Sequence, residues 1–163
     1  MPFGIASLNC LPNFTFTYLP QPMKSLRLEL EYEYDFDLYG VVSSSKEYTL
    51  AWALNKYFRL RLVKQADLCI DFLHKGRLVI SNYLHRAEHG SLRLFRNRSI
   101  GTSTLATPYL VPDIKEYDYV IQVTGALDHF QQELLHKLHA IPLVQYVRSF
   151  DPNCLRYKEN LLF

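Results

Sequence analysis

The sequence predicts an α+β fold: a mostly antiparallel sheet of five to six strands with two amphipathic helices on one face, in the order β-α-β-β-β-β-α-β. Three observations lead to this prediction. One long segment alternates apolar and polar residues, two later segments carry apolar residues at helical spacing, and short alternating segments between them are separated by turn residues. The chain has 163 residues, of which 48% are hydrophobic and 21% are charged, which is enough for one globular core.

The first element is a strand at residues 26–38, where apolar and polar residues alternate without a break. A period of two places one set of side chains in the core and the other set on the opposite face. Because like charges in a line repel, something should meet the acidic face: solvent, a metal ion or a basic neighbour. We expect Gly40 and the serines after it to break the strand. The acidic face carries five carboxylates, on Glu29, Glu31, Glu33, Asp35 and Asp37.

A helix is expected to begin near Ser45, because Ser44 and Glu47 have the spacing of a capping box. Three strands should follow at residues 68–72, 77–84 and 92–98, with turns at residues 74–76 and 88–90, and together they form an antiparallel meander. The apolar stripe of the helix consists of Leu50, Ala51, Leu54, Tyr57 and Phe58.

The second half of the chain continues this pattern. Residues 99–108 are rich in Ser, Thr and Gly and form a loop. From Tyr117 the period of two resumes, with one face formed by Tyr117, Tyr119, Ile121 and Val123. Asp128 and Gln131 open a second helix that ends at Pro142, and its apolar stripe is Phe130, Leu134, Leu138 and Ile141. A last strand at residues 143–147 and a turn at residues 151–153 follow.

The N-terminal 22 residues differ from the rest, because they lack Lys, Arg, Asp and Glu and contain four prolines. We interpret residues 1–22 as a flexible or non-native extension and residues 23–163 as a single α+β domain, with Met23 as the natural start. A signal peptide would carry a positively charged n-region, which these residues do not have. Three widely spaced cysteines without a CxxC pair, and apolar runs shorter than about 20 residues, predict a cytoplasmic protein with reduced thiols and no membrane span.

Residues 111–119 read VPDIKEYDY and resemble the signature that names the IPExxxVDY family of small bacterial proteins. The acidic strand followed by Gly40, residues 51–55 and the tail at residues 158–163 are also similar, so the resemblance covers residues 23–163. Tyr117 replaces the Val of the signature, whereas Val111 and Asp113 are conservative replacements. The resemblance implies an uncharacterised protein with no catalytic residues to carry over.

The same signature has a physical interpretation. Pro112 fixes φ and ends the loop, Asp113 bonds its own downstream backbone in a tight turn, and Asp118 and Tyr119 begin a strand. We therefore consider two roles for these four residues: they hold the local structure, or they form a functional surface.

Trp52 lies about 160° from the centre of the apolar stripe of its helix, taking roughly 100° per residue. Its neighbours on that polar face include Tyr48, Asn55 and Arg59. Aromatic residues beside arginine on a polar face are typical of interaction hot spots. We expect this surface to contact a protein partner or a second copy of the chain, or to be covered by the tail or the N-terminal arm.

Residues 59–98 carry nine basic and three acidic residues, although the formal net charge of the whole chain is only +2. The arginines of the meander, Arg77, Arg93, Arg96 and Arg98, mix cations with Phe95 as RNA-binding strands do, but no RNA-binding signature is recognisable. The alternative is that these strands lie beside the acidic strand and form cross-strand charge pairs with it.

Residues 85–89 match the H-x-x-E-H pattern of inverted zinc proteases, which needs a helix to place both histidines on one face. A helix has no room between two adjacent strands, so we expect a polar hairpin turn. His129, His136 and His139 should lie on the solvated face of the second helix. We expect no metal, no cofactor and no small-molecule substrate. The predicted function is a non-catalytic module acting through protein contacts; the first alternative is an RNA-associated accessory factor and the second a metal-dependent hydrolase.

Overall fold

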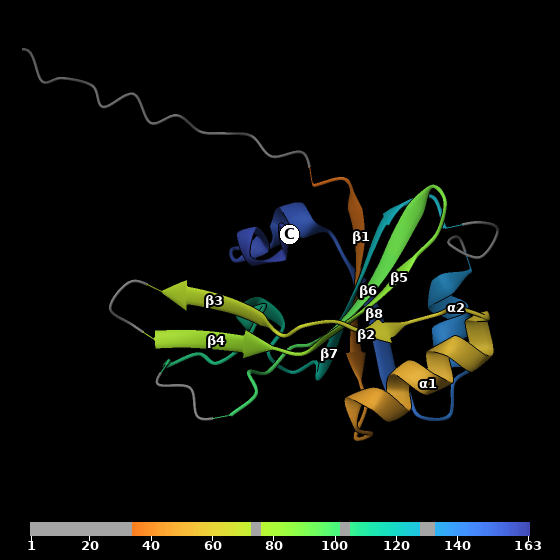
Figure 1. Ribbon diagram of the computed structural model, residues 1–163, viewed down its shortest axis with the longest axis horizontal. Coiled ribbons are helices and arrows are strands. Elements are labelled where there is room, and N and C mark those ends of the chain that lie inside the picture. The colour runs from red at the N-terminus through yellow and green to blue at the C-terminus, as the bar shows by residue number, and fades with distance from the viewer. Residues whose placement is uncertain (1–33, 73–75, 102–104, 128–132) are drawn as a thin grey trace, which may run out of the picture. The chain divides into compact units, whose positions relative to one another are not determined.

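The computed structural model describes residues 34–72, 76–101, 105–127 and 133–163 (Figure 1). A six-stranded antiparallel sheet has the strand order β2-β5-β6-β7-β1-β8. Its strands are β1 (Phe36–Val42), β2 (Val63–Lys64), β5 (Asn82–Arg86), β6 (Gly90–Arg96), β7 (Tyr119–Gly125) and β8 (Tyr146–Phe150). A separate two-stranded sheet pairs β3 (Leu68–Phe72) with β4 (Gly76–Ile80), and the α-helices are α1 (Glu47–Phe58) and α2 (Leu134–His139).

The structure confirms the α+β class and the antiparallel sheet with two helices. Within the described residues, however, the element order contains two more strands than expected. β2 is a two-residue strand paired with β5, and the strand expected at residues 77–84 divides at Ser81 into β4 and β5. Ser81 is fully buried, and its carbonyl accepts a hydrogen bond from the Arg96 N–H at 3.0 Å. The chain thus passes from the small sheet to the large sheet at Ser81.

Both helices pack against the same face of the six-stranded sheet (Figure 1). The sheet contributes buried side chains of β1, β6 and β7 to this layer, among them Val41, Leu94 and Ile121. The predicted stripe of α2 is confirmed at Leu134 and Leu138. Ile141 is buried in the same cluster but lies after the helix, which ends at His139 and not at Pro142. The predicted start at residues 128–131 lies outside the described residues. α1 buries Leu50, Ala51, Ala53, Leu54 and Phe58.

The opposite face of the sheet is covered by β4 and by irregular segments. Leu38, Phe95 and Val120 of the sheet belong to this second cluster and are fully buried. Among the described residues, three short 3-10 helices lie in the irregular segments: η1 (Pro112–Ile114), η3 (Pro152–Cys154) and η4 (Lys158–Leu161). The covering side chains include Leu78, Ile80, Leu110, Val111, Ile114, Leu155 and Leu161. The sheet is therefore buried on both faces at its centre.

Gly40 does not break the first strand, contrary to the prediction, but lies inside β1 between Val120 of β7 and Arg148 of β8. A side chain is excluded there because a Cβ on Gly40 would lie 2.6 Å from Cδ1 of Tyr117. The absence of a side chain at Gly40 allows the Tyr117 ring to pack directly against the backbone of β1. Residues 26–33 of the predicted strand lie outside the described residues.

The proposed pairing of the acidic strand with the basic meander is wrong for the described part of β1. β7 and β8 are the neighbours of β1, and β7 separates it from β6. Asp35 and Asp37 are exposed. The charge pairs of the meander are instead formed with other carboxylates.

α1 begins at Glu47 and not at a serine cap. The N-cap residue Lys46 makes no side-chain capping bond, because a lysine ammonium cannot accept a backbone N–H. The Glu47 carboxylate accepts a hydrogen bond from the Ser81 hydroxyl at 3.1 Å. Tyr57, expected in the apolar stripe, is 52% exposed, and Ala53 is buried in its place.

Several strand boundaries differ from the prediction by two or three residues. β6 ends at Arg96 and β7 begins at Tyr119, so Tyr117 packs with the cluster on the opposite face and not with Tyr119. β8 begins at Tyr146 rather than at residue 143. The predicted turn at residues 151–153 is confirmed, because the Asp151 carboxylate accepts the Asn153 N–H at 2.9 Å.

Among the described residues, no helix is long and apolar enough to cross a membrane. These residues belong to one compact unit. The predicted extension at residues 1–22 lies outside the described residues.

Candidate functional site

The outer face of α1 presents two large aromatic side chains to solvent. Trp52 is 62% exposed and Tyr48, one helical turn earlier, is 59% exposed. The Lys56 ammonium lies 5.2 Å from the centroid of the Trp52 ring, and the Lys46 ammonium lies 5.9 Å from that of Tyr48. We name Lys46, Tyr48, Trp52, Lys56 and Arg59 the aromatic-basic face. The described C-terminal segment packs on the opposite face of the sheet and does not cover it.

Asn55 and Arg59, the other two residues predicted at this surface, shape the end of α1. The Asn55 amide accepts the Leu62 N–H at 2.6 Å and donates to the Leu62 carbonyl at 3.1 Å. Arg59 adopts a left-handed conformation with φ of 54° and donates its N–H to the Asn55 carbonyl, which ends the helix. Asn55 is therefore engaged within the chain, whereas Arg59 is exposed.

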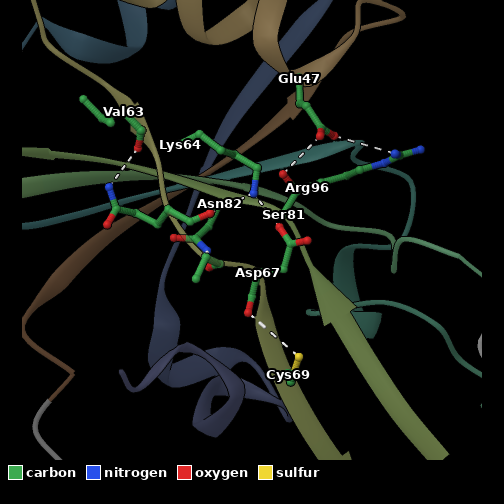
Figure 2. A network of polar contacts seen from close by, with 10 residues as sticks. Glu47, Val63, Lys64, Asp67, Cys69, Ser81, Asn82 and Arg96 are labelled. Atoms are coloured by element: carbon green, nitrogen blue, oxygen red, sulfur yellow. Dashed lines mark hydrogen bonds and ion pairs between the residues drawn. The ribbon is translucent and has the colours of Figure 1, made fainter.

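The aromatic-basic face carries cations without acidic neighbours from its own helix. Glu47 is the only acidic residue of α1. Figure 2 shows that its side chain turns inward to the Ser81 hydroxyl and to Arg96, whose guanidinium lies 3.6 Å from a Glu47 oxygen. The outer side of the helix is left positively charged.

The four arginines proposed as an RNA surface do not form one surface. Arg77 binds both oxygens of Asp71 on the small sheet, at 2.6 and 3.3 Å, and this lowers the pKa of the Asp71 carboxyl. Arg93 lies on the opposite face of the sheet with its guanidinium 5.7 Å from the Phe163 ring, and burial lowers its pKa. Only Arg96 and Arg98 lie near each other, beside a hollow described below.

The signature residues fasten separate segments together. Asp113 does not bond its own downstream backbone as predicted, because its carboxylate accepts the N–H groups of Arg156 and Tyr157 at 3.0 and 3.2 Å. Asp118 accepts the Ser43 N–H at 3.0 Å. The Tyr119 hydroxyl donates to the Ser45 carbonyl, and burial raises the pKa of Tyr119 to about 12. Pro112 is the first residue of η1.

Asn97 is the residue that sequence reasoning missed in this region. It is fully buried, and its side chain donates to the carbonyls of Ile114 and Tyr117, both at 3.0 Å. It also accepts the Val111 N–H at 2.9 Å. The only sequence signal is an asparagine directly after an alternating strand, which is too common to single out.

A hollow of about 280 Å³ lies where the start of α1, the end of β6 and the signature segment meet. It brings together residues that the sequence predicts on two different surfaces. Arg96 and Arg98 of the charge surface line it with Asp118 and Tyr119 of the signature. Other lining residues that the sequence did not predict at a site include Ser44, Tyr109 and Lys115. Its chemistry combines three cations, several hydroxyl groups and one carboxylate.

The segment that matched the zinc-protease pattern is a hairpin turn, as predicted. His85 lies on β5, where its Nδ1 accepts the Arg61 N–H at 3.1 Å, and Glu88 and His89 lie in the turn before β6. In the part of the chain that the structure describes, no group of three His, Cys, Asp or Glu residues could hold a metal ion. His136 and His139 lie on α2, and His129 lies outside the described residues.

Comparison with protein-family models, with curated proteins and with solved structures finds no match for this chain. The resemblance of residues 111–119 to the IPExxxVDY signature therefore stays a prediction. The site must be interpreted from its own geometry.

Proposed function

We propose that this protein is a non-catalytic interaction module that binds an acidic segment of a partner protein through the aromatic-basic face of α1. The observation that carries the proposal is the 62% exposure of Trp52 beneath a lysine 5.2 Å from its ring. A Trp buries on the order of 150–250 Å² when it is covered, which makes an exposed one a strong source of binding energy. The cations around it supply the specificity for carboxylates.

Charge supports an acidic partner over a neutral one. Lys46, Lys56 and Arg59 are exposed, and the single carboxylate of α1 is turned inward toward Ser81 and Arg96. An acidic segment would meet three cations and two rings without a repelling carboxylate from this helix. Such complementarity increases association rates more than affinity, and salt weakens it.

The non-catalytic character of the proposal rests on the contacts of the polar residues. Asp113 and Asp118 accept backbone N–H groups, and Asn97 binds three backbone groups. These side chains are used to hold segments in place. We propose the cytoplasm as the site of action, in keeping with the exposed free thiols of Cys69 and Cys154.

The test compares two exposed aromatic residues of one helix. Trp52→Ala should remove proteins captured from native lysate by the immobilised chain, while Tyr57→Ala should not, because Tyr57 is 52% exposed but lies roughly 140° away around the helix axis. A photo-crosslinker at position 48 should join peptides enriched in Asp and Glu, and raised salt should weaken the capture.

Two results would overturn the proposal. Capture of the same proteins by the wild type and by Trp52→Ala would remove the surface from the function. Crosslinks formed only with a second copy of the chain, together with a dimer in sedimentation, would make the face a homodimer contact. Trp52 is the only tryptophan of the chain, so its fluorescence reports directly on the occupied face.

A further inference from the structure

We propose that the hollow between α1, β6 and the signature segment binds a protonated phosphate group, as in hydrogen phosphate or the monoanion of a phosphate monoester. The hollow of about 280 Å³ does not include Trp52, so this proposal is independent of the aromatic-basic face. Its volume falls just below the roughly 300–1,000 Å³ of drug-sized ligand pockets, which suits one small anionic group.

Unused positive charge is the first argument. Arg96, Arg98 and Lys115 all line the hollow. Arg96 is partly neutralised by Glu47 at 3.6 Å, but none of the ion pairs between described residues includes Arg98 or Lys115. Two cations that line the same hollow and form no ion pair repel each other, and an anion between them removes that repulsion. Arginine adds a planar fork of donors that matches phosphate oxygens.

Hydroxyl donors are the second argument. The Ser44 hydroxyl oxygen accepts a hydrogen bond from the Gln145 amide at 3.4 Å, so its own proton can be donated to a ligand. Tyr109 also lines the hollow. The Tyr119 hydroxyl is already used, because it donates to the Ser45 carbonyl. The hollow therefore offers neutral donors beside the cations, and an oxyanion has enough acceptor sites to use both.

The single carboxylate of the hollow defines which anion fits. Asp118 uses one oxygen to accept the Ser43 N–H at 3.0 Å and would repel an anion that can only accept hydrogen bonds. A phosphate group that keeps one proton can donate it to the carboxylate, and a second phosphate pKa near 6 leaves such a form available around neutral pH. Sulfate carries no proton at this pH. The carboxylate should therefore favour phosphate over sulfate.

The test uses the full chain and inorganic phosphate, measured by titration calorimetry at pH 6.5. We expect saturable binding that is at least tenfold weaker in the double variant Arg98→Gln/Lys115→Gln, both of whose side chains are exposed. Arg86→Gln is the matched control, because Arg86 is an exposed arginine outside the hollow. Trp52→Ala should bind phosphate like the wild type. Unchanged thermal unfolding would show that the variants fold.

Selectivity provides the second readout. Phosphate should bind at least fivefold more tightly than sulfate, and Asp118→Asn should remove most of this difference, since an amide oxygen still accepts the Ser43 N–H but repels sulfate less. Equal affinity of the wild type and the double variant, or equal affinity for both anions, would overturn the proposal.

Two further ligands separate the sources of the phosphate group. A phosphate monoester such as phosphoserine should compete with inorganic phosphate if the hollow takes small phosphorylated compounds. A ten-nucleotide RNA that binds with a steep salt dependence while inorganic phosphate does not bind would overturn the proposal in favour of nucleic acid.

Discussion

The two faces of the six-stranded sheet are held by different means. On the helix face, α1 and α2 satisfy their own backbones and contribute apolar side chains at helical spacing. On the opposite face the covering segments are irregular, and side-chain amides bind their backbone groups: Asn97 binds residues 111, 114 and 117, Gln122 donates to Leu161, and Asn160 donates to Leu110. Apolar periodicity suffices where a helix covers a sheet, whereas an irregular cover needs particular polar side chains.

The largest effect is expected from Asn97→Ala on the opposite face. The change would leave the buried Tyr117 carbonyl and the buried Val111 N–H without this partner, at about 1–3 kcal/mol each, whereas the Ile114 carbonyl still accepts the Tyr117 N–H at 3.0 Å. We expect the free energy of unfolding to fall by about 2–6 kcal/mol, measured by urea denaturation.

Two control variants connect this result to the comparison of faces. Leu54→Ala should cost about 2–5 kcal/mol through a cavity on the helix face, because Leu54 is fully buried. Asn153→Ala replaces an exposed asparagine and should cost much less than Asn97→Ala. If Asn97→Ala cost no more than Asn153→Ala, the hydrogen bonds of Asn97 to the irregular segments would not contribute to stability.

The second prediction concerns the contact of β1 with this cover. Gly40→Ala places a Cβ 2.6 Å from the Tyr117 ring and 2.9 Å from the Phe150 ring, so both rings must move. Overpacking of this kind costs about 1–3 kcal/mol, measured as a lower urea midpoint with an unchanged slope.

A double-mutant cycle identifies the neighbour that causes this cost. In the background of Tyr117→Val the ring is gone, so Gly40→Ala should cost less than in the wild type. Equal costs in both backgrounds would mean that Tyr117 does not set the requirement for glycine.

Much of the fold could be predicted from the sequence. Apolar spacing predicts the helix face, as the buried stripe of α2 shows. Local turn residues predict the turns at residues 88–90 and 151–153. The wrong prediction at Gly40 has a physical cause. From the local sequence a glycine indicates a strand break, whereas here a glycine is required because the Tyr117 ring, 77 positions later in the chain, leaves no space for a Cβ. Tertiary contacts of this kind leave no periodic signal.

The candidate sites show the same division. Exposure of Trp52 could be predicted, because its position relative to the stripe follows from the helical angle. The hollow could not, because Arg98, Tyr109 and Lys115 come from segments without a shared period and meet only through the irregular cover. The predicted pairing of the acidic strand with the meander was wrong for a similar reason. Strand order depends on long-range pairing, which charge alone does not determine.

The last prediction concerns a polar contact on the helix face and has the smallest effect. Tyr119 belongs to the helix-side cluster and donates its hydroxyl proton to the Ser45 carbonyl before α1. Tyr119→Phe should lower the free energy of unfolding at pH 8 by about 1 kcal/mol, the usual net value of one hydrogen bond. This is well below the cost of Asn97→Ala because only one contact is lost and the ring remains.

The dependence of stability on pH isolates the same hydroxyl. Burial raises the pKa of Tyr119 to about 12 in the folded chain, with Arg96 lowering it and Glu47 raising it to smaller extents. An unfolded tyrosine loses its proton near pH 10, so its contribution to stability is present below about pH 10 and is lost as the pH rises to about 12. Burial also raises the pKa of Tyr39, Tyr83 and Tyr117, so both proteins should weaken in alkali. Urea unfolding at pH 9, 10 and 11 should show a steeper loss in the wild type than in Tyr119→Phe. Parallel stability curves for the two proteins would mean that Tyr119 has the same pKa in the folded and the unfolded chain. The Tyr119 hydroxyl would then make no pH-dependent contribution to the stability of the helix face.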